Sequence, residues 1–461
     1  MNILLVNPPP HHIQEEFYDR PPYPRTALAF LAASLRSNRI DVSVLDCKFD
    51  RISHEMAIKE ICRIKPDLVG YTAFTNEVIQ AGRLAGDVKK KLPVSKAIIG
   101  GVHATILPEK TLREFPAFDY TCIGEGESTI VELVQFLERD GIAAKPESIK
   151  GIAFLDNSGN YVRNGDREKI GIADKSLETI PLPAWDMFRP ASEYYLHTQR
   201  GCPYHCPFCV NPNGRIVRRE SPERVINQVK ELSEKYKCKR IVFGDEIFTL
   251  DREHTIAICN GLIKQGLNKK LKWQCQTHIN FIDEELAVTM KKAGCNMVGL
   301  GIESGDPERL KRIGKGTSLE NVLSAVSSVK RARLPFNAYF ILGQPDETEE
   351  SARRTIDFAV KINPGTPIFG IMVPYPGTKI GKMAETGEGG YILSAKNWND
   401  YNKQIGDALD FSGVRRKTLE RLQFFGYIKV YLKNWRLLDF IKFCWKYKTE
   451  GVTVIKKMLN L

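Results

Sequence analysis

Three cysteines on one short loop carry the strongest chemical signal in the sequence. Cys202, Cys206 and Cys209 follow a predicted strand with the spacing C-x₃-C-x₂-C. Thiolates are the usual ligands of iron–sulfur clusters, and three of them leave one iron of a cubane-type [4Fe–4S] cluster without a protein ligand. The open iron can bind a small chelating ligand, such as the amino and carboxylate groups of a methionine. An electron from the cluster can then cleave an adjacent sulfonium.

A zinc site that uses His205 as its fourth ligand is the alternative interpretation of the same loop. Pro203, Pro207 and the aromatic Phe208 surround the candidate ligands, and a long strand–helix pattern follows. Both features disfavour a small zinc knob. We therefore predict an iron–sulfur cluster.

The elements that must position this loop form a repeating pattern of six strands separated by helices. Parallel strands joined by helices predict an open (β/α)₆ barrel over residues 191–378. With the cysteine loop, residues 194–380 resemble the radical S-adenosylmethionine (SAM) superfamily. The predicted strands are Tyr194–Gly201, Arg240–Phe248, Lys272–Asn280, Met297–Ser304, Pro335–Gly343 and Pro367–Pro374.

The resemblance implies that SAM contacts lie at the carboxyl ends of these strands. Asp245 stands where the superfamily usually has a glycine in Gly-Gly-Glu, so Glu246 is the safer assignment. His278 stands where relatives often carry arginine, and a hydrogen-bonding structural role is as good an expectation for it as contact with SAM. The implied SAM-binding residues are Phe208, Asp245, Glu246, Glu303, Ser304, Gly343 and Val373.

Residues 1–140 alternate short apolar runs with helical stretches, which predicts a doubly wound, Rossmann-like parallel sheet. Ligands of such sheets bind beyond the carboxyl ends of the strands, where this sequence places its glycine-rich turns. The region resembles the cobalamin-binding half of the same superfamily. The cobalamin contacts that this implies are Asn7, Pro8, Thr72, Phe74, Thr75, Gly100, Gly101, Val102, His103, Gly124, Glu125, Gly126 and Glu127.

One departure concerns the axial ligand of cobalt. Many cobalamin domains use a D-x-H-x-x-G loop after their first strand, and here Pro8-Pro9-Pro10 is followed by His11 and His12 without the aspartate or glycine. Either histidine could approach cobalt by proximity alone. We expect a corrinoid without a histidine ligand.

The remaining segments predict a linker and a helical end. Residues 141–190 contain a hairpin signal at Asn157–Asn160 followed by a turn-rich stretch, which we interpret as a linker. Residues 379–461 form a predicted helical C-terminal domain. Its last part, from Phe424, is basic and rich in Trp, Tyr and Phe. Such helices either contact an anionic membrane surface or cap the barrel with their aromatic face.

Composition limits the location and the partners of the chain. The 461 residues hold 11 cysteines, an odd and irregularly spaced number that does not suit a disulfide framework. No signal peptide or membrane-spanning run is recognisable. We expect a cytoplasmic protein, with any peripheral contact at the inner face of the membrane. The formal net charge of +12 has no accompanying nucleic-acid module, so no nucleic-acid partner is expected.

Together, the resemblances imply a cobalamin-dependent radical SAM enzyme similar to the class B methylases, with three cofactors: SAM, a [4Fe–4S] cluster and cobalamin. The implied reaction is methylation of an unactivated carbon, in which methylcobalamin carries the methyl group and a 5′-deoxyadenosyl radical abstracts hydrogen. A cyclase or rearrangement enzyme without methyl transfer uses the same motifs and is the alternative. A cobalamin-binding sensor would not need the three cysteines. Expected partners are an electron donor such as flavodoxin or ferredoxin, and a small-molecule, lipid or peptide substrate.

Overall fold

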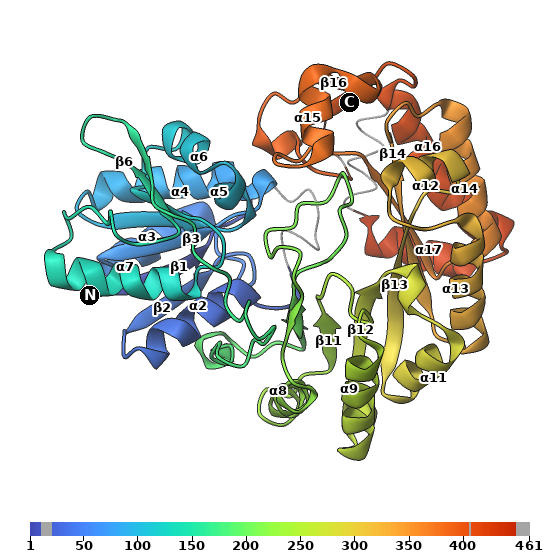
Figure 1. Ribbon diagram of the computed structural model, residues 1–461, viewed down its shortest axis with the longest axis horizontal. Coiled ribbons are helices and arrows are strands. Elements are labelled where there is room, and N and C mark those ends of the chain that lie inside the picture. The colour runs from blue at the N-terminus through green and yellow to red at the C-terminus, as the bar shows by residue number, and fades with distance from the viewer. Residues whose placement is uncertain (11–20, 405–406, 449–461) are drawn as a thin grey trace. The chain divides into compact units, whose positions relative to one another are not determined.

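The computed structural model describes residues 1–10, 21–404 and 407–448, and divides the chain into two compact units (Figure 1). The first unit holds the described residues up to Ala191 together with Asn211–Arg219. The second holds Ser192–Val210 and the described residues from Glu220 onward. The cysteine loop therefore lies in the second unit, and the segment that follows it returns to the first.

A seven-stranded sheet with the order β2-β1-β3-β4-β5-β6-β7 forms the centre of the first unit. Neighbouring strands from β2 to β5 are parallel, and every residue of β1 and β3 is buried, as expected where helices cover both faces (Figure 1). This confirms the predicted doubly wound domain. The strands are β1 (Ile3–Asn7), β2 (Val42–Asp46), β3 (Leu68–Thr72), β4 (Lys96–Gly100), β5 (Tyr120–Cys122), β6 (Ile152–Leu155) and β7 (Tyr161–Arg163).

The helices of this unit connect the parallel strands. α3 begins at Ser53, whose hydroxyl accepts the Met56 N–H, and ends at Lys65 in the left-handed region. The helices are α2 (Thr26–Ser37), α3 (His54–Ile64), α4 (Val78–Lys91), α5 (Val102–Ile106), α6 (Pro108–Glu114) and α7 (Glu127–Asp140), with short 3₁₀ turns at η1 (Thr75–Glu77) and η2 (Trp185–Met187).

The segment predicted as a linker belongs to the first unit. β6 pairs antiparallel with β5 and β7 pairs antiparallel with β6, and the Asp156 carboxylate accepts the Ser158 and Asn160 N–H groups in the turn between them. Ile152, Ala153 and Phe154 are buried, which explains why the hairpin extends the sheet instead of standing apart. Further along, Leu177 and Ile180 pack against Phe30 of α2.

The second unit is built on a six-stranded sheet with the order β15-β14-β13-β12-β11-β8, in which every neighbouring pair is parallel. This confirms the predicted partial (β/α)₆ barrel. The strands are β8 (Glu193–Leu196), β11 (Arg240–Phe243), β12 (Lys272–Thr277), β13 (Cys295–Glu303), β14 (Phe336–Leu342) and β15 (Thr366–Ile371); the two-residue strands β9 (Gln199–Arg200) and β10 (Arg218–Arg219) lie in the second and first unit, respectively.

Short polar side chains start most of the barrel helices. Asp251, Asp283, Asp306, Ser318 and Thr348 each accept a backbone N–H in the first turn of α9, α11, α12, α13 and α14. Each such cap is worth about 1 kcal/mol. The helices are α8 (Pro222–Glu234), α9 (Arg252–Lys264), α10 (Leu267–Lys270), α11 (Glu284–Lys292), α12 (Pro307–Ile313), α13 (Leu319–Arg331) and α14 (Glu349–Ile362), with η3 at Ile279–Phe281.

The C-terminal part of the second unit packs on the last barrel strand. The Gln423 amide in α16 donates to the Phe369 carbonyl of β15 at 2.7 Å, and Gly426 lies against the Phe369 ring. The elements are α15 (Lys379–Thr386), η4 (Glu388–Gly390), β16 (Tyr391–Leu393), η5 (Trp398–Asp400), β17 (Leu409–Phe411), α16 (Arg416–Lys433) and α17 (Leu437–Lys446). Within the described residues, no helix combines the length and the hydropathy that crossing a membrane requires.

Candidate functional site

The cysteine loop leaves the barrel at Gly201, whose φ of 101° favours glycine, and continues without regular secondary structure. Cys202 and Cys206 are partly exposed and Cys209 is exposed. The Cys209 N–H donates to the Cys206 carbonyl at 3.1 Å, and the Ile380 N–H donates to the Pro207 carbonyl at 3.0 Å. α15 therefore begins against the backbone of this loop.

These three thiols differ from most of the others in the chain. Six of the other cysteines are buried, and burial raises the pKa of Cys122 to about 12 and that of Cys238 to about 11. Buried thiols of this kind stay protonated and pack as small apolar groups. The accessible thiols of one loop are the set that fits an iron–sulfur cluster.

No group of three or more His, Cys, Asp or Glu side chains in the described ranges is already arranged as a metal site. The fit to a cluster therefore rests on the donor set: three thiols within eight residues, at the carboxyl end of a barrel strand. His205, the fourth ligand in the zinc alternative, is exposed.

An aromatic contact joins the cysteine loop to the third barrel strand. The Tyr204 ring stacks on His278 with a centroid distance of 4.5 Å, and the edge of Phe281 completes the group. His278 is almost fully buried just after β12. Its position beside the loop favours the structural role that the sequence left open.

Hydrogen bonds fix the tautomer of His278. Its Nδ1 accepts the Asn280 N–H at 3.2 Å, so Nε2 carries the proton and donates to the Lys315 carbonyl at 3.2 Å. Burial, aided by the nearby Lys315 cation, lowers the pKa of His278 to about 4. The imidazole is therefore neutral at physiological pH and positions its neighbours without exchanging a proton.

Lys315, which the sequence analysis did not single out, contacts a predicted SAM-binding residue. Its Nζ lies 2.6 Å from the Glu303 carboxylate and donates to the Gly301 carbonyl at 2.8 Å. Gly314 and Gly316, both at positive φ, bend the chain on either side of the lysine. The sequence signal that could have identified this lysine is the glycine on each side of it, in the turn between α12 and α13.

Glu303 ends β13 in the left-handed region with φ 68°, and the Gln344 amide donates to its carbonyl at 3.0 Å. The neighbouring Ser304 hydroxyl lies 3.0 Å from that of Thr355 and accepts the Asp306 N–H, so it supports the start of α12. The structure thus brings Glu303 to a strand end with its cation. Ser304 is fully buried, with its hydroxyl engaged in these hydrogen bonds.

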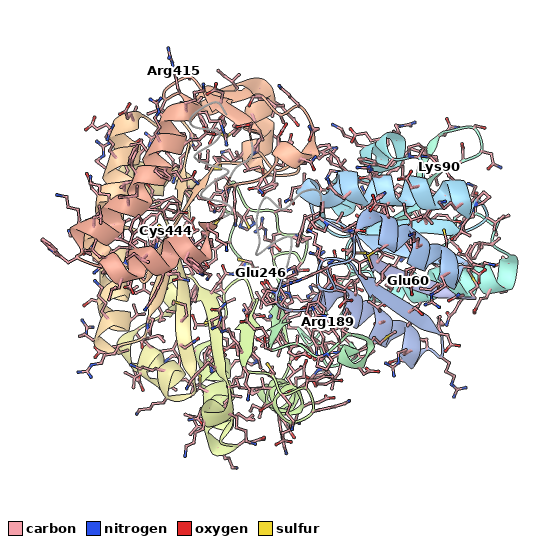
Figure 2. All side chains as sticks on the ribbon, turned by 180° about the vertical axis from the view of Figure 1, so that it is seen from behind. Glu60, Lys90, Arg189, Glu246, Arg415 and Cys444 are labelled. Atoms are coloured by element: carbon pink, nitrogen blue, oxygen red, sulfur yellow. The ribbon has the colours of Figure 1, made fainter. Side chains whose placement is uncertain are left out.

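Asp245 and Glu246 follow β11 but have different surroundings. Asp245 is fully buried and accepts hydrogen bonds from the Thr198 N–H, the Thr198 hydroxyl and the Gln199 N–H at 2.7–3.0 Å. Burial raises its pKa to about 7. These contacts favour a role in shaping the strand that leads to the cysteine loop. Glu246, labelled in Figure 2, is only partly buried, and its role towards SAM stays a prediction.

The remaining predicted SAM residues lie at the ends of the last two strands and in the loop. Gly343 has φ 80°, and a Cβ there would clash with Phe411 at 2.5 Å. Its N–H donates to the buried Glu347, and its carbonyl accepts the Tyr391 hydroxyl. Val373 is buried against Tyr401, and Phe208 is half-buried.

In the first unit, the order β2-β1-β3 places the switch in strand order between β1 and β3. Doubly wound sheets bind their ligands at this point. The last residues of these two strands and the loops after them include five of the predicted cobalamin residues, of which Asn7, Thr72 and Thr75 are buried and Phe74 is 43% exposed. Pro8 directly follows Asn7.

Charged residues that the sequence analysis did not single out support these loops. Buried Glu77 lies 2.7 Å from Lys48 and 3.4 Å from Arg25, and accepts the Phe74 N–H at 2.8 Å. Although burial alone would raise it, the two cations lower the pKa of Glu77 to about 2. Asp46, which accepts the Asn7 amide and the Arg25 N–H, completes the network.

The turns after β4 and β5 bring the other predicted cobalamin residues to the same edge of the sheet. Gly101, between Gly100 and Val102, has φ 97°, and a Cβ there would meet the Ala73 carbonyl at 2.7 Å. His103 is buried, and burial lowers its pKa to about 4. Gly124, whose N–H donates to Thr105, has open space around it, and Gly126 and the buried Glu127 begin α7. An edge of glycines and small polar residues fits a large ligand such as cobalamin.

Glu125 has a structural partner. Its carboxylate makes a two-sided ion pair with Arg218, with both distances 2.9 Å, and accepts the Ile170 N–H. Arg218 is fully buried and also donates to the Ile170 and Asn213 carbonyls. This pair fastens Asn211–Arg219 to the first unit. His11 and His12 lie outside the described residues.

Comparison with protein-family models assigns the two halves separately. Residues 21–134 match the B12 binding domain, and residues 196–359 match the radical SAM superfamily.

Two curated relatives are similar over most of the chain. An uncharacterized methyltransferase of Pyrococcus horikoshii is 33% identical over 94% of this chain and 93% of its own. The anaerobic magnesium-protoporphyrin IX monomethyl ester cyclase of Cereibacter sphaeroides is 27% identical over 82% of this chain and 63% of its own.

Solved structures share the fold. The radical SAM methyltransferase TsrM of Kitasatospora setae, with cobalamin and a [4Fe–4S] cluster bound, superimposes with a TM-score of 0.74 at 19% identity, covering 92% of this chain and 90% of that one. The cobalamin-dependent SAM radical enzyme OxsB gives 0.67 at 22% identity, over 91% of this chain and 57% of that one.

Proposed function

We propose, from the premise that this chain belongs to the cobalamin-dependent radical SAM methyltransferase family, that it methylates an unactivated carbon of a small molecule. One observation carries the proposal: a single chain holds a three-cysteine loop at the strand ends of a radical SAM barrel and an open strand-order switch in a B12 binding domain. A radical SAM barrel does not by itself need cobalamin, and a B12 binding domain does not by itself need an iron–sulfur cluster. Their presence in one chain therefore supports a reaction that uses both.

When bound, the cluster and SAM supply a hydrogen-abstracting radical, and cobalamin supplies a methyl group that SAM alone cannot deliver to a carbon without nucleophilic character. Cys202, Cys206 and Cys209 hold the cluster. Glu246 and Glu303 bind the cationic and hydroxyl groups of SAM. Lys315 holds the Glu303 carboxylate in place, at 2.6 Å, and so orients it.

His278 and Tyr204 connect the cysteine loop to the turn that carries Lys315. Because His278 is neutral, it adds no second positive charge beside a cationic substrate. In the first unit, Asn7, Thr72, Phe74 and Thr75 form one side of the proposed cobalamin site. The predicted turns after β4 and β5 form the other.

The substrate class and the electron donor are finer points of the proposal. TsrM has been solved with tryptophan bound, which is consistent with a small-molecule substrate. Reductive cleavage of SAM requires one electron, so a low-potential donor such as flavodoxin or ferredoxin must reach the cluster.

Counting the products of SAM tests the proposal. With substrate present, S-adenosylhomocysteine and 5′-deoxyadenosine are expected in about equal amounts, because each methylation consumes one SAM for the methyl group and one for the radical. SAM with a deuterated methyl group should deliver CD₃ intact. Label missing from the product would overturn methyl transfer.

Ring closure is the second candidate, favoured by the similarity to the magnesium-protoporphyrin cyclase. It predicts 5′-deoxyadenosine without matching S-adenosylhomocysteine, and a product that gains no CH₂. Product mass therefore separates the two candidates directly.

A further inference from the structure

The helix α17 has two apolar faces, of which the second unit uses one. On the inner face, the Phe443 ring packs on Tyr427 at 5.0 Å and on Tyr431 at 5.4 Å, both from α16. Phe440 and Tyr447 extend this contact along the helix. The inner face therefore fixes α17 to α16 and confirms part of the expectation that the C-terminal helices cap the barrel.

The outer face is exposed. Leu437, Leu438, Ile441 and Trp445 recur at helical spacing and are 55%, 74%, 62% and 76% exposed, respectively. Cys444, on the same helix, is also exposed (Figure 2). Single exposed apolar residues are ordinary, but a contiguous row of large ones marks an interaction surface.

A second large aromatic side chain stands in the turn before this helix. Trp435 is 90% exposed and has φ 57°, a left-handed conformation that bulky residues avoid. Arg436 fixes the turn, since its guanidinium donates to the Pro364 and Gly365 carbonyls at 2.6 and 2.7 Å. The fold thus holds an indole in solvent at a cost in backbone strain, as occurs at functional sites.

Positively charged residues accompany the row in the sequence. From Arg415 to Lys448 the sequence contains ten lysines and arginines and only two carboxylates, Glu420 and Asp439, which accounts for much of the formal net charge of +12. Lys442 and Lys446 are exposed on α17 itself, and the Lys448 ammonium lies 5.2 Å from the Trp445 ring. Charge and apolar surface therefore coincide on one element.

We infer that Trp435 and the outer face of α17, named here the α17 surface, bind the headgroup region of an anionic lipid bilayer. Tryptophan prefers this interface, where its ring is half in hydrocarbon and its N–H is wet, and flanking lysines are attracted to anionic headgroups. The ten described residues of α17 are far too few to cross a bilayer, so the proposed binding places this helix in the bilayer plane. A nucleic acid would use the lysines but has no need of exposed leucines and isoleucine.

Vesicle binding tests this inference independently of catalysis, so its outcome and that of the proposed function are separable. The reconstituted full-length protein is sedimented with vesicles of phosphatidylcholine containing phosphatidylglycerol, and with pure phosphatidylcholine. We expect binding to the anionic vesicles that weakens as salt is added. Brominated acyl chains should quench the emission of Trp435 and Trp445, the two exposed indoles, whereas Trp185 and Trp273 are buried and Trp398 is partly buried.

Paired variants locate the surface. The double variants Trp435→Ser with Trp445→Ser, and Lys442→Glu with Lys446→Glu, should each lower the partition coefficient by about tenfold or more. Matched controls change exposed apolar or lysine side chains elsewhere: Met56→Ser with Val94→Ser, which are 58% and 78% exposed, and Lys264→Glu with Lys269→Glu, all exposed. The controls should bind like the wild type.

Three results would overturn the inference. The first is no binding to anionic vesicles at low salt, and the second is equal binding by the tryptophan variant. The third is a wild-type protein whose Trp435 and Trp445 emission is already that of buried indole without lipid, which would show that another part of the chain or a second copy covers the surface. Competition by RNA that depends on the lysines but not on the tryptophans would likewise replace the lipid with a nucleic acid.

Discussion

Burial disfavours the ionised form of the buried carboxylates in both units, but their different neighbours shift their pKa values in opposite directions. In the first unit, Glu77 is contacted by Lys48 and Arg25, and its pKa falls to about 2. In the second unit, Asp245 and Glu347 are held mainly by neutral N–H and O–H donors, and burial raises the pKa of each to about 7. The presence of a cation in contact, rather than the depth of burial, decides the outcome.

The difference fits the ligands proposed for each unit. The first unit completes its charge pairs internally and offers glycines and small polar groups at its strand ends. In the barrel, the Lys315 ammonium contacts Glu303, one of the carboxylates proposed to bind SAM, which is a cation.

The largest effect expected from any single change is loss of the cluster thiolates. Cys202→Ala, Cys206→Ala or Cys209→Ala should abolish both iron binding and 5′-deoxyadenosine formation, because each removes one of only three cluster ligands. Iron analysis after anaerobic reconstitution measures this. Cys122→Ala in the first unit and Cys259→Ala in the barrel, both buried, should retain about four irons per chain. A wild-type cluster in a loop variant would refute the assignment.

Removing a cation from the first unit should be the next largest effect. Lys48→Met leaves buried Glu77 without its closest partner and should destabilise this unit by about 3–5 kcal/mol. Hydrogen exchange of β1 and β3 amides measures the loss locally. The double variant Lys48→Met with Glu77→Gln, which removes both charges, should recover much of it. Equal instability of the two variants would show that the ion pair is not the cause.

The pH dependence of stability should have opposite signs in the two units. Glu77 has a lowered pKa, so its contribution is present above about pH 4.5 and is lost as the pH falls towards 2. Asp245 has a raised pKa, so its contribution is present below about pH 4 and is lost as the pH rises through 7.

Asp245→Asn should therefore flatten the pH dependence of the barrel's free energy of unfolding between about pH 4 and 7, a change of about 3 kcal/mol. Hydrogen exchange of β11 and β12 amides at several pH values reports on this unit alone. If the variant kept the full pH dependence of the wild type, Glu347 or another group would have to be its source.

Lys315 should give the smallest of these effects and the most specific one. Lys315→Met removes a charged hydrogen bond to Glu303 and should raise the SAM concentration needed for half-maximal 5′-deoxyadenosine formation by about tenfold. Lys315→Arg should restore part of it. Lys311→Met, at an exposed position of α12, is the matched control and should change nothing. An unchanged SAM dependence in Lys315→Met would remove Glu303 from the proposed SAM site.

Patterns in consecutive residues predicted the strands, helices and turns. They did not predict the ion pairs between residues far apart in the sequence. The cysteine loop, the barrel strands and the glycine-rich turns are visible because each is a short pattern in consecutive residues. Arg218 is invisible as a structural residue because its partner Glu125 is 93 positions away. The hairpin β6–β7 has a clear turn signal. Only its pairing with β5 explains why it extends the sheet instead of forming a linker. Lys315 and Lys48 were missed for the same reason, since ion pairs depend on the fold.

The return of Asn211–Arg219 to the first unit has a consequence for synthesis on the ribosome. A chain that folded strictly from its N-terminus would finish one domain before starting the next. Here the buried Arg218 reaches Glu125 only after β8 and the cysteine loop have been translated. Until then, the Arg218 guanidinium is not available to pair with the Glu125 carboxylate of the first unit. The nascent B12 binding domain is therefore incomplete until the cluster ligands have been translated. Completion of the first unit thus depends on the synthesis of part of the second.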